Sequence, residues 1–305
     1  MSHARHGSDS APLVSVIVPV FDDSERLANC LAALRAQTYP ADRYEVLVVD
    51  NGSRDDVGAL VASFPGFSFE REDRVGSYAA RNKGIEASKG EVLAFTDADC
   101  LPEPGWIEAG VSALSDSPRW QAVGGPIEMF ARDPERLTPF DLHDLVWGMP
   151  QRVYVERFGL AATANLFAYR STFDRVGGFD PDFRSCGDCE WSFRLTAAGF
   201  ELGYCREARI RHPTRSSLAS FVRRRRRIAG GYHRLEPALE RHPEKDFEIP
   251  RSFSHSLNRV RRSWRHPLLA STRRRLQFAA AELLLYGVTR VETWRLRFGG
   301  EPVRG

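Results

Sequence analysis

No stretch of this 305-residue chain is apolar over the ~20 residues that a membrane-spanning helix needs. The first residues, MSHARHGSDSAP, are polar and carry no apolar signal region, so we expect residues 1–12 to be flexible. The five cysteines are an odd number without framework spacing, and the single CxxC (Cys186 and Cys189) has no second pair for zinc. These absences predict a protein of the reducing cytoplasm.

Acidic residues are scarce in the last third of the chain. Residues 206–305 carry 24 Arg and Lys against 9 Asp and Glu, whereas residues 1–205 carry 19 against 31. The acidic body favours a site that needs a cation, and the basic tail favours contact with anions. A nucleic-acid-binding protein would need basic residues across the whole fold. We therefore expect no nucleic-acid partner, although binding through the Arg-rich tail stays an alternative.

Apolar strands alternate with amphipathic helices over the first 118 residues. LVSVIVPVF (13–21) is almost continuously apolar, as expected for a strand that is buried on both faces. This alternation predicts an α/β fold with a mostly parallel central sheet and helices on both faces. The expected strands are 13–21, 45–49, 67–70 and 91–96, and the expected helices are 22–37, 55–63 and 77–88.

The pattern is less regular after residue 118. We expect single strands in QAVGGPIEMF (121–130) and ELGYCREARIRH (201–212), a strand and helix in 163–180, and a helix in 187–200. A basic helix (216–228), a Pro/His/Arg-rich connection (236–266) and a long helical region (268–298) follow. The predicted organisation is a catalytic domain (13–215), whose halves meet near 118 and 119, and a basic helical extension (216–305).

Acidic side chains follow three of the predicted strands. Ligands of parallel sheets bind at the carboxyl ends of the strands, where Asp22 with Asp23, Asp50, and Asp97 with Asp99 would converge. Alone, the pair in EVLAFTDADC is better explained by a capping Asp and a solvated Asp than by a metal site. Its position beside Asp50 favours a site for Mg²⁺ or Mn²⁺, which prefer oxygen ligands.

Several motifs together give the chain a resemblance to a known family. VSVIVPVFDDSERLANCLAALRAQTYP, EVLVVDNGSRDD, GSYAARNKGIEASKGEVLAFTDADC, GGPI, TANLFAYRSTFDRVGGFD and GDCEWSFRLTAAGF occur in the order typical of glycosyltransferase family 2. The resemblance covers about residues 13–213 and implies the GT-A fold. It also implies inverting transfer from a nucleotide-diphospho-sugar, UDP- before GDP-, to a hydroxyl acceptor, as in polysaccharide biosynthesis. Mn²⁺ or Mg²⁺ would bridge the diphosphate to the DxD motif.

The resemblance assigns roles to residues of this sequence. Pro19, Val20 and Phe21 would line the nucleoside pocket near Asp22, and Asp50 would bind the base or ribose. Asp97 would face ribose or sugar, whereas Asp99 and His212 would ligate the metal; an imidazole suits Mn²⁺ better than Mg²⁺. Arg81 and Asn82 match a segment near the donor.

Asp188 matches the position of the catalytic base, which takes a proton from the acceptor hydroxyl. The family commonly has two acids here, but this sequence has Gly187 before Asp188, with Glu190 as the fallback base. A helix N-cap is the structural alternative for Asp188. Trp191 is a candidate for packing on an acceptor sugar, or else a core residue.

The basic tail contains five consecutive arginines in SFVRRRRRIAGG (220–231). A helix spreads them around its axis, so we expect Arg224 or Arg227 at phosphate and the others in solvent or at lipid head groups. Residues 273–298 are interrupted by Glu282. They fit a helix on an anionic membrane, a cover on the catalytic domain, a homodimer contact or ordinary core packing.

Other enzymes fit less well. A phosphatase with a DxD nucleophile wants this motif on the first strand, and a nucleotidyltransferase usually has a Gly-rich basic loop where this chain has PVFDDSER. A catalytically impaired GT-A-fold protein that only binds sugar nucleotides stays open because of Gly187. We therefore expect a metal-dependent glycosyltransferase that is cytoplasmic, with peripheral membrane contact through the basic helices as one arrangement.

Overall fold

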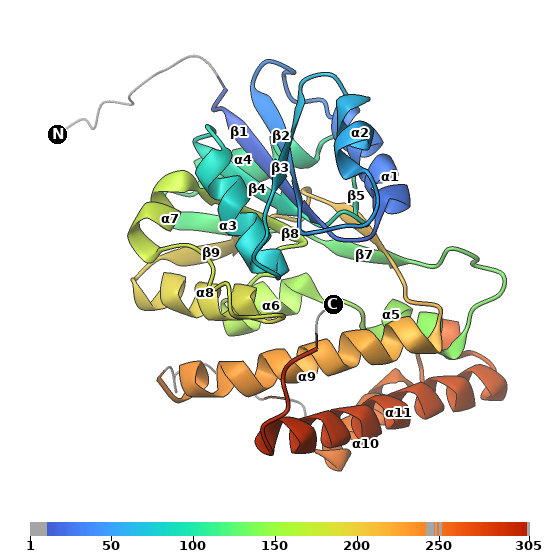
Figure 1. Ribbon diagram of the computed structural model, residues 1–305. Coiled ribbons are helices and arrows are strands. Elements are labelled where there is room, and N and C mark those ends of the chain that lie inside the picture. The colour runs from blue at the N-terminus through green and yellow to red at the C-terminus, as the bar shows by residue number, and fades with distance from the viewer. Residues whose placement is uncertain (1–10, 242–246, 248, 250–251, 304–305) are drawn as a thin grey trace.

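The computed structural model describes residues 11–241, 247, 249 and 252–303. A seven-stranded sheet with the order β3-β2-β1-β4-β8-β6-β9 forms its centre (Figure 1). β8 runs antiparallel to its neighbours β4 and β6, whereas the other neighbouring strands pair in parallel. The strands are β1 (Val14–Val20), β2 (Tyr44–Asp50), β3 (Phe67–Arg71), β4 (Val92–Thr96), β6 (Trp120–Gly124), β8 (Asn165–Tyr169) and β9 (Glu201–Tyr204). The predicted mostly parallel sheet is confirmed.

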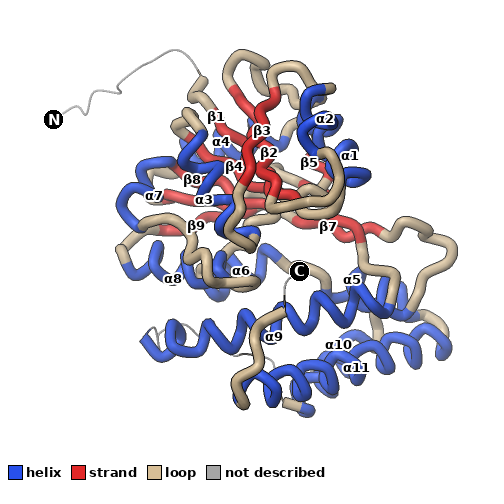
Figure 2. Tube along the Cα trace, in the orientation of Figure 1, coloured by secondary structure: helices blue, strands red, loops and turns tan. Residues whose placement is uncertain are grey.

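Helices cover both faces of this sheet (Figure 2). Side chains alternate along β1, so that Val14, Val16 and Val18 lie in one core cluster and Ile17 in another. The first cluster also holds side chains of α1 (Ser24–Arg35), α2 (Val57–Ala62) and α4 (Trp106–Asp116). The second holds side chains of α3 (Ser77–Ala87), α6 (Gln151–Phe158), α7 (Arg170–Val176) and α8 (Gly187–Ala197).

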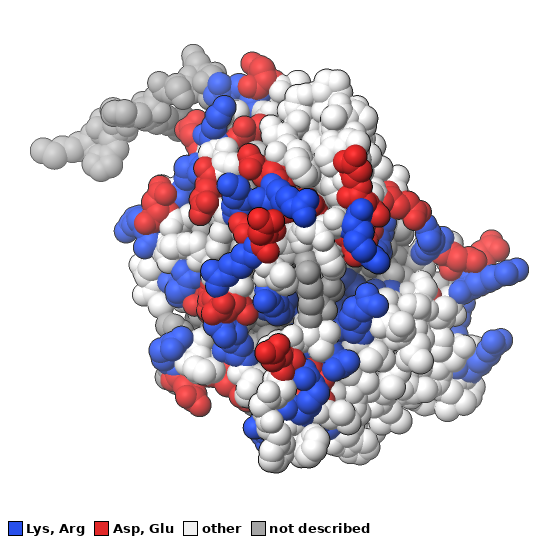
Figure 3. Space-filling view, viewed as in Figure 1, with Lys and Arg blue, Asp and Glu red and all other residues white. Residues whose placement is uncertain are grey.

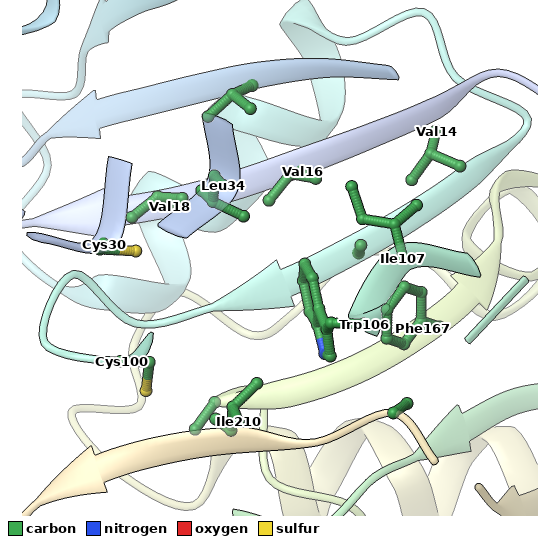
Figure 4. Packing of buried hydrophobic residues seen from close by; sticks show 14 of the residues in the cluster. Val14, Val16, Val18, Cys30, Leu34, Cys100, Trp106, Ile107, Phe167 and Ile210 are labelled. Atoms are coloured by element: carbon green, nitrogen blue, oxygen red, sulfur yellow. The ribbon is translucent and has the colours of Figure 1, made fainter. Parts of the chain in front are cut away.

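Figure 4 shows how closely the first cluster is packed. Trp106 of α4 lies against Phe167 of β8, with 4.7 Å between the ring centroids, and neither side chain is exposed. Trp106 Nε1 also donates a hydrogen bond of 2.8 Å to Asn165 Oδ1. The indole nitrogen is therefore satisfied within the core, so a bulky aromatic ring is buried there without an unpaired polar atom.

A second, three-stranded sheet positions residues of the acidic edge. It has the order β5-β10-β7, with β5 (Leu101–Pro102), β7 (Ile127–Phe130) and β10 (Ile210–Pro213). β5 begins directly after the DADC sequence, and Leu101 of β5 pairs with Arg211 of β10. His212 follows Arg211 and is therefore brought beside the two aspartates, although it is more than a hundred positions away in the sequence.

The two expected long strands are wrong, because each is two strands in different sheets. Residues 121–130 contain the end of β6 and all of β7, and residues 201–212 contain β9 and most of β10. At the first crossing, a Cβ on Gly125 would lie 1.9 Å from the Ala208 carbonyl oxygen, and Pro126 has no N–H to continue a ladder. The close approach of these two connections requires the glycine.

The C-terminal helices form a layer beneath the sheet domain in Figure 1. They are α9 (Leu218–Arg241), α10 (Phe253–Ser263), the 3₁₀ helix η1 (Pro267–Leu269) and α11 (Thr272–Arg297), and α5 (Pro139–Trp147) packs with them. α9 continues beyond the predicted 216–228, and α10 lies within the stretch expected as a connection. Leu235 and Ala238 of α9 belong to the same core cluster as Trp191.

α11 is held to this layer through buried polar side chains. Glu282 lies 3.1 Å from His143 Nε2 of α5, and Glu292 lies 2.8 Å from Arg226 Nε of α9. Each glutamate is 2% exposed. Packing against the rest of the chain, one of the arrangements expected for 273–298, is therefore present. Of the predicted flexible stretch 1–12, residues 1–10 lie outside the described residues. In the part of the chain that the structure describes, no helix is long and apolar enough to cross a membrane.

Candidate active site

A cavity of about 1430 Å³ lies at the edge of the sheet where β1 and β4 end. Ligand pockets usually measure about 300–1,000 Å³, so this cavity has room for more than one small substrate. Most of the residues singled out from the sequence line it. They are Pro19, Val20, Phe21, Asp22, Arg81, Asp97, Asp99, Asp188, His212, Arg224 and Arg227.

Asp97, Asp99, Cys100 and His212 form the candidate metal centre. Each offers one ligand atom, and these atoms all lie within 4.8 Å of one another. His212 Nδ1 donates a hydrogen bond of 2.8 Å to the Pro213 carbonyl, so Nε2 carries the lone pair and lies 3.5 Å from Asp99 Oδ1. Burial lowers the pKa of His212, which keeps the imidazole neutral as a metal ligand must be.

The charge state of the other groups also fits a hard divalent cation. Burial disfavours the charged form of Asp99, but the positive charges of His212 in its protonated form, Arg215 and Arg26 outweigh it and hold the pKa of Asp99 below its usual range. The pKa of Cys100 is raised well above its usual range by burial and by the two aspartates, so its thiol stays protonated. Carboxylate oxygen and imidazole nitrogen therefore make up the donor set, which suits Mn²⁺.

Asp97 is held by a buried arginine. Its Oδ1 accepts a hydrogen bond from Arg81, whose side chain is 4% exposed and lies over the Tyr78 ring. Asn82, the neighbour of Arg81, has a structural role instead: its amide donates to the Phe179 carbonyl at 2.7 Å and accepts from the Phe179 N–H at 2.9 Å. Asn82 does not line the cavity, and its place near the donor stays a prediction.

The predicted nucleoside end of the cavity is shaped by two strand ends. Asp22 has a positive φ of 50° and accepts a hydrogen bond of 2.8 Å from the Arg54 N–H, which joins the ends of β1 and β2. Asp50 is 3% exposed, accepts from the Ser53 N–H at 2.9 Å and does not line the cavity, whereas Asn51 does. The contact of Asp50 with base or ribose stays a prediction.

Asp188 is fixed by three hydrogen-bond donors on the cavity wall, one of which is the N–H of the adjacent Cys189 at 3.0 Å from Oδ1. The Tyr78 hydroxyl donates to Oδ1 at 3.0 Å, and the Thr163 N–H donates to Oδ2 at 3.1 Å. Burial and the charge of Asp188 raise the pKa of Tyr78 well above its usual range, so the phenol stays a neutral donor. The residue that precedes α8 is Cys186, so Asp188 is not the N-cap.

The structure explains why this chain has Gly187 before Asp188, where the family commonly has a second acidic residue. A Cβ at this position would lie 2.8 Å from the Tyr78 ring, so any side chain here would displace the ring. The glycine thus allows the Tyr78 hydroxyl to reach Asp188, in the place where a second acidic residue was expected. No pattern in the sequence singled out Tyr78 or the Thr163 backbone.

Two residues of α8 that were expected to take part in the site do not line the cavity. Trp191 is fully buried, stacks on Phe173 with 4.6 Å between ring centroids, and donates from Nε1 to the Gly177 carbonyl at 3.0 Å. The expectation that its ring packs on an acceptor is therefore corrected to core packing. Glu190 is paired with Arg194 at 2.8 Å and is not part of the cavity wall, so it does not provide a fallback base.

The five arginines of α9 are divided between two surfaces. Arg223, Arg224 and Arg227 line the cavity, since Arg227 follows the other two by four and three positions, which places it on the same side of the helix as each of them. Arg225 Nε donates to Thr289 Oγ1 at 2.6 Å, and Arg226 pairs with Glu292. The expectation that the remaining arginines lie in solvent or at lipid head groups is therefore wrong for Arg225 and Arg226, which bind α11.

Arg215 is a further cation of the cavity that the sequence did not single out. It follows β10, close to His212, and its backbone N–H donates to Asp144 Oδ2 at 3.2 Å. Burial and the nearby Arg224 lower the pKa of Arg215 to about 10, so it stays charged at neutral pH. Its Nη1 is buried without a hydrogen-bond partner in the described residues. Such an unsatisfied guanidinium nitrogen beside the candidate metal centre is suited to an anionic ligand.

Fold and cavity together define an α/β protein with a candidate ligand site at the carboxyl edge of the sheet. The model of glycosyl transferase family 2 matches residues 15–171. Glycosyltransferase AglE of Haloferax volcanii is 36% identical over 229 residues, which are 73% of this chain and 74% of that protein. The chain therefore belongs to glycosyltransferase family 2 and is a glycosyltransferase.

Two further proteins are similar to this chain, one in sequence and one in structure. Validoxylamine A glucosyltransferase of Streptomyces hygroscopicus subsp. jinggangensis is 28% identical over 232 residues, 65% of this chain and 54% of that protein. Mannosyltransferase PcManGT of Pyrobaculum calidifontis, solved with GDP-Man and Mn²⁺, is 20% identical with a TM-score of 0.60. Its structure matches 95% of this chain and 85% of its own, and supports the GT-A fold.

Proposed function

We propose that this glycosyltransferase is metal-dependent and inverting, and moves a sugar from a nucleotide-diphospho-sugar to a hydroxyl group of an acceptor. The observation that carries the proposal is that Asp99 and His212, the candidate metal ligands, line the same cavity as Asp188, the candidate base. A donor diphosphate and an acceptor hydroxyl need these two functions on either side of one reacting carbon.

A bound donor would bring the negative charge of its diphosphate into the cavity. The residues around this end of the cavity can compensate that charge. Asp99 and His212 would hold a divalent cation, which would neutralise the diphosphate and assist its departure. Arg215 and Arg224 would add positive charge beside it. The GDP-Man and Mn²⁺ of the mannosyltransferase structure support a nucleotide sugar and a divalent metal in general. We expect UDP first, with GDP as the alternative.

Asp188 would act as the general base. As the acceptor oxygen forms its bond to the anomeric carbon, the hydroxyl proton moves to the Asp188 carboxylate. The bond from this carbon to the diphosphate oxygen breaks on the opposite face, and its electron pair leaves with the nucleotide. One displacement of this kind inverts the anomeric configuration. The Tyr78 hydroxyl and the Thr163 N–H would keep the carboxylate oriented.

A donor screen tests this proposal most directly. The thermal unfolding midpoint should rise in the presence of one class among UDP-, GDP- and dTDP-sugars, and the rise should need Mn²⁺ or Mg²⁺. Hydrolysis of that donor, or transfer to an added acceptor, should then be detected with inversion at the anomeric carbon. If a donor raises the midpoint equally in excess chelator, the metal-dependent part of the proposal is wrong.

A further inference from the structure

The solvent side of α11 carries a continuous apolar stripe. Its exposed side chains are Leu276, Leu283, Val291, Trp294 and Phe298, of which Leu283 is 50% and Phe298 75% exposed. The exposed Ala280 and Gly287 fill the positions between them, so apolar residues recur every three or four positions. This spacing places them along one side of the helix. We call these seven residues, Ala280 and Gly287 included, the α11 stripe.

The α11 stripe is separate from the face that packs inward. Phe278, Ala281 and Leu285 point to the other side and are buried in clusters with residues of α5 and α9. Trp294 and Phe298 contact each other, with 5.0 Å between ring centroids, but both remain more than half exposed. Within the described ranges, the stripe is therefore an apolar surface of a kind that marks a binding site in soluble proteins.

Positive charge surrounds the stripe. Residues 252–300 contain ten arginines and two acidic residues, and both acids, Glu282 and Glu292, are buried and paired. Arg273, Arg290 and Arg297 are exposed along the stripe itself. In Figure 3 acidic side chains are concentrated over the sheet domain and are few over the lower helices.

The neighbouring helix α10 has the same character. Leu257 and Trp264 are exposed beside Arg261, Arg262 and Arg265, and together they line a shallow groove. Exposed apolar and basic residues are thus present on α10 as well as on α11, and the two helices pack against each other.

We propose that the α11 stripe and its arginines bind the surface of an anionic lipid bilayer, with the helix lying in the interface. Apolar side chains would enter the boundary between head groups and acyl chains, Trp294 would sit at the head-group level, and the arginines would contact lipid phosphates. The helix has too few consecutive apolar residues to span the bilayer. A second copy of the chain is a poorer occupant, because it would bring a second row of unpaired arginines against the first.

The proposal predicts binding to vesicles without any substrate. The full chain should sediment with vesicles of phosphatidylglycerol and phosphatidylcholine in equal parts, and much less with vesicles of phosphatidylcholine alone. The triple variant Leu283→Ser, Trp294→Ser, Phe298→Ser should weaken this binding by about tenfold or more, since three exposed apolar anchors are lost. Replacing Arg273, Arg290 and Arg297 by Gln should weaken it and reduce its sensitivity to salt.

A matched control is available in Val153, which is 47% exposed on α6, away from α11. Val153→Ser should bind anionic vesicles like the unchanged chain. All variants should keep the circular dichroism spectrum of the unchanged chain, because the substituted side chains are exposed. Absence of vesicle binding by the unchanged chain would overturn the proposal, as would unchanged binding by the triple variant. A dimer in light scattering that the triple variant dissociates would assign the stripe to a second copy and would also overturn it.

Discussion

Arg224 Nη1 of α9 lies 3.2 Å from Oδ1 of Asp144 in α5, and this carboxylate is 1% exposed. The other oxygen of Asp144 accepts from the Arg215 N–H. Asp144 is next to His143, which contacts Glu282 of α11. A path of buried polar contacts therefore leads from the cavity wall to the C-terminal helices, and in it the Asp144 carboxylate depends on Arg224 for charge compensation.

The first prediction concerns stability and pH. Burial opposes the charge of Asp144, but Arg224 and neighbouring groups hold its pKa well below its usual range. An acid whose pKa is depressed by folding stabilises above its unfolded pKa, here about 4, and this stabilisation is lost as pH falls below about 4. Asp144→Asn should thus lower the free energy of unfolding by about 3 kcal/mol at neutral pH. The difference should shrink below about pH 4.

Urea unfolding at neutral pH and near pH 3 measures this difference. The exposed Asp174 of α7 provides the matched control, since Asp174→Asn removes the same charge without a buried partner. Equal destabilisation by Asp144→Asn at both pH values would show that the ionic contact is not its cause.

The second prediction concerns the base. Asp188→Asn should keep donor affinity and lose transfer by about a thousandfold, because the amide cannot accept the hydroxyl proton. Donor binding by calorimetry and turnover of the same preparation separate the two effects. Glu190→Gln is the internal control, since Glu190 is paired with Arg194 outside the cavity. Normal turnover by Asp188→Asn would remove the base assignment.

The third prediction concerns the metal. Asp99→Ala and His212→Ala should each lower Mn²⁺ affinity by about tenfold or more, because they remove predicted ligands of the cation. Titration of Mn²⁺ by electron paramagnetic resonance measures this without donor or acceptor. Asp42→Ala, an exposed acid in the turn before β2, should leave Mn²⁺ affinity unchanged. Equal Mn²⁺ affinity of Asp99→Ala and the control would contradict the site.

The fourth prediction concerns the diphosphate. Arg215→Gln should weaken donor binding by about tenfold, as expected when one charge-assisted contact to phosphate is lost. The loss should be similar for the free nucleoside diphosphate and much smaller for the nucleoside itself, which carries no phosphate. Arg206→Gln serves as the matched control, because Arg206 is exposed and lies outside the cavity. A loss of the same size for the nucleoside would indicate a general disturbance of the fold.

The fifth prediction concerns the crossing between the two sheets. Gly125→Ala should destabilise the chain by about 2 kcal/mol or more, since its Cβ would meet the Ala208 carbonyl oxygen at 1.9 Å. Gly287→Ala, in the exposed middle of α11 with nothing within 4 Å of its Cβ, should leave stability unchanged or raise it by up to about 1 kcal/mol. Chemical unfolding of both variants decides the matter, and equal stability would contradict the close approach.

Much of the fold could be predicted because the first half has strong local patterns. β1, β2 and β4 are almost wholly apolar, and their positions agree with the expected strands to within one or two residues. The crossings at Gly125 and between β9 and β10 could not be predicted, since a change of sheet leaves the period of a strand intact. α5 and α6 were missed because their apolar spacing is short and irregular.

The site shows the same division. Asp97 and Asp99 end a strand and stand out, whereas Tyr78, Asn51 and Arg215 act through contacts with distant segments that no local pattern records. For Trp191 the sequence left acceptor packing and core packing both open, because a short helix does not reveal which of its apolar sides is buried. The partners of Arg225 and Arg226 come from α11, more than sixty positions away.

The two-sided use of α9 bears on where the chain can be divided. A fragment that ends near residue 215 would lose the arginines of one cavity wall and the Leu235 side chain that completes the core around Trp191. It would also lose the counter-charge of Asp144. The last third of the chain is therefore not an independent unit that could be exchanged between related enzymes. A chimera that takes its C-terminal helices from a relative would have to take α5 and α9 together with α11.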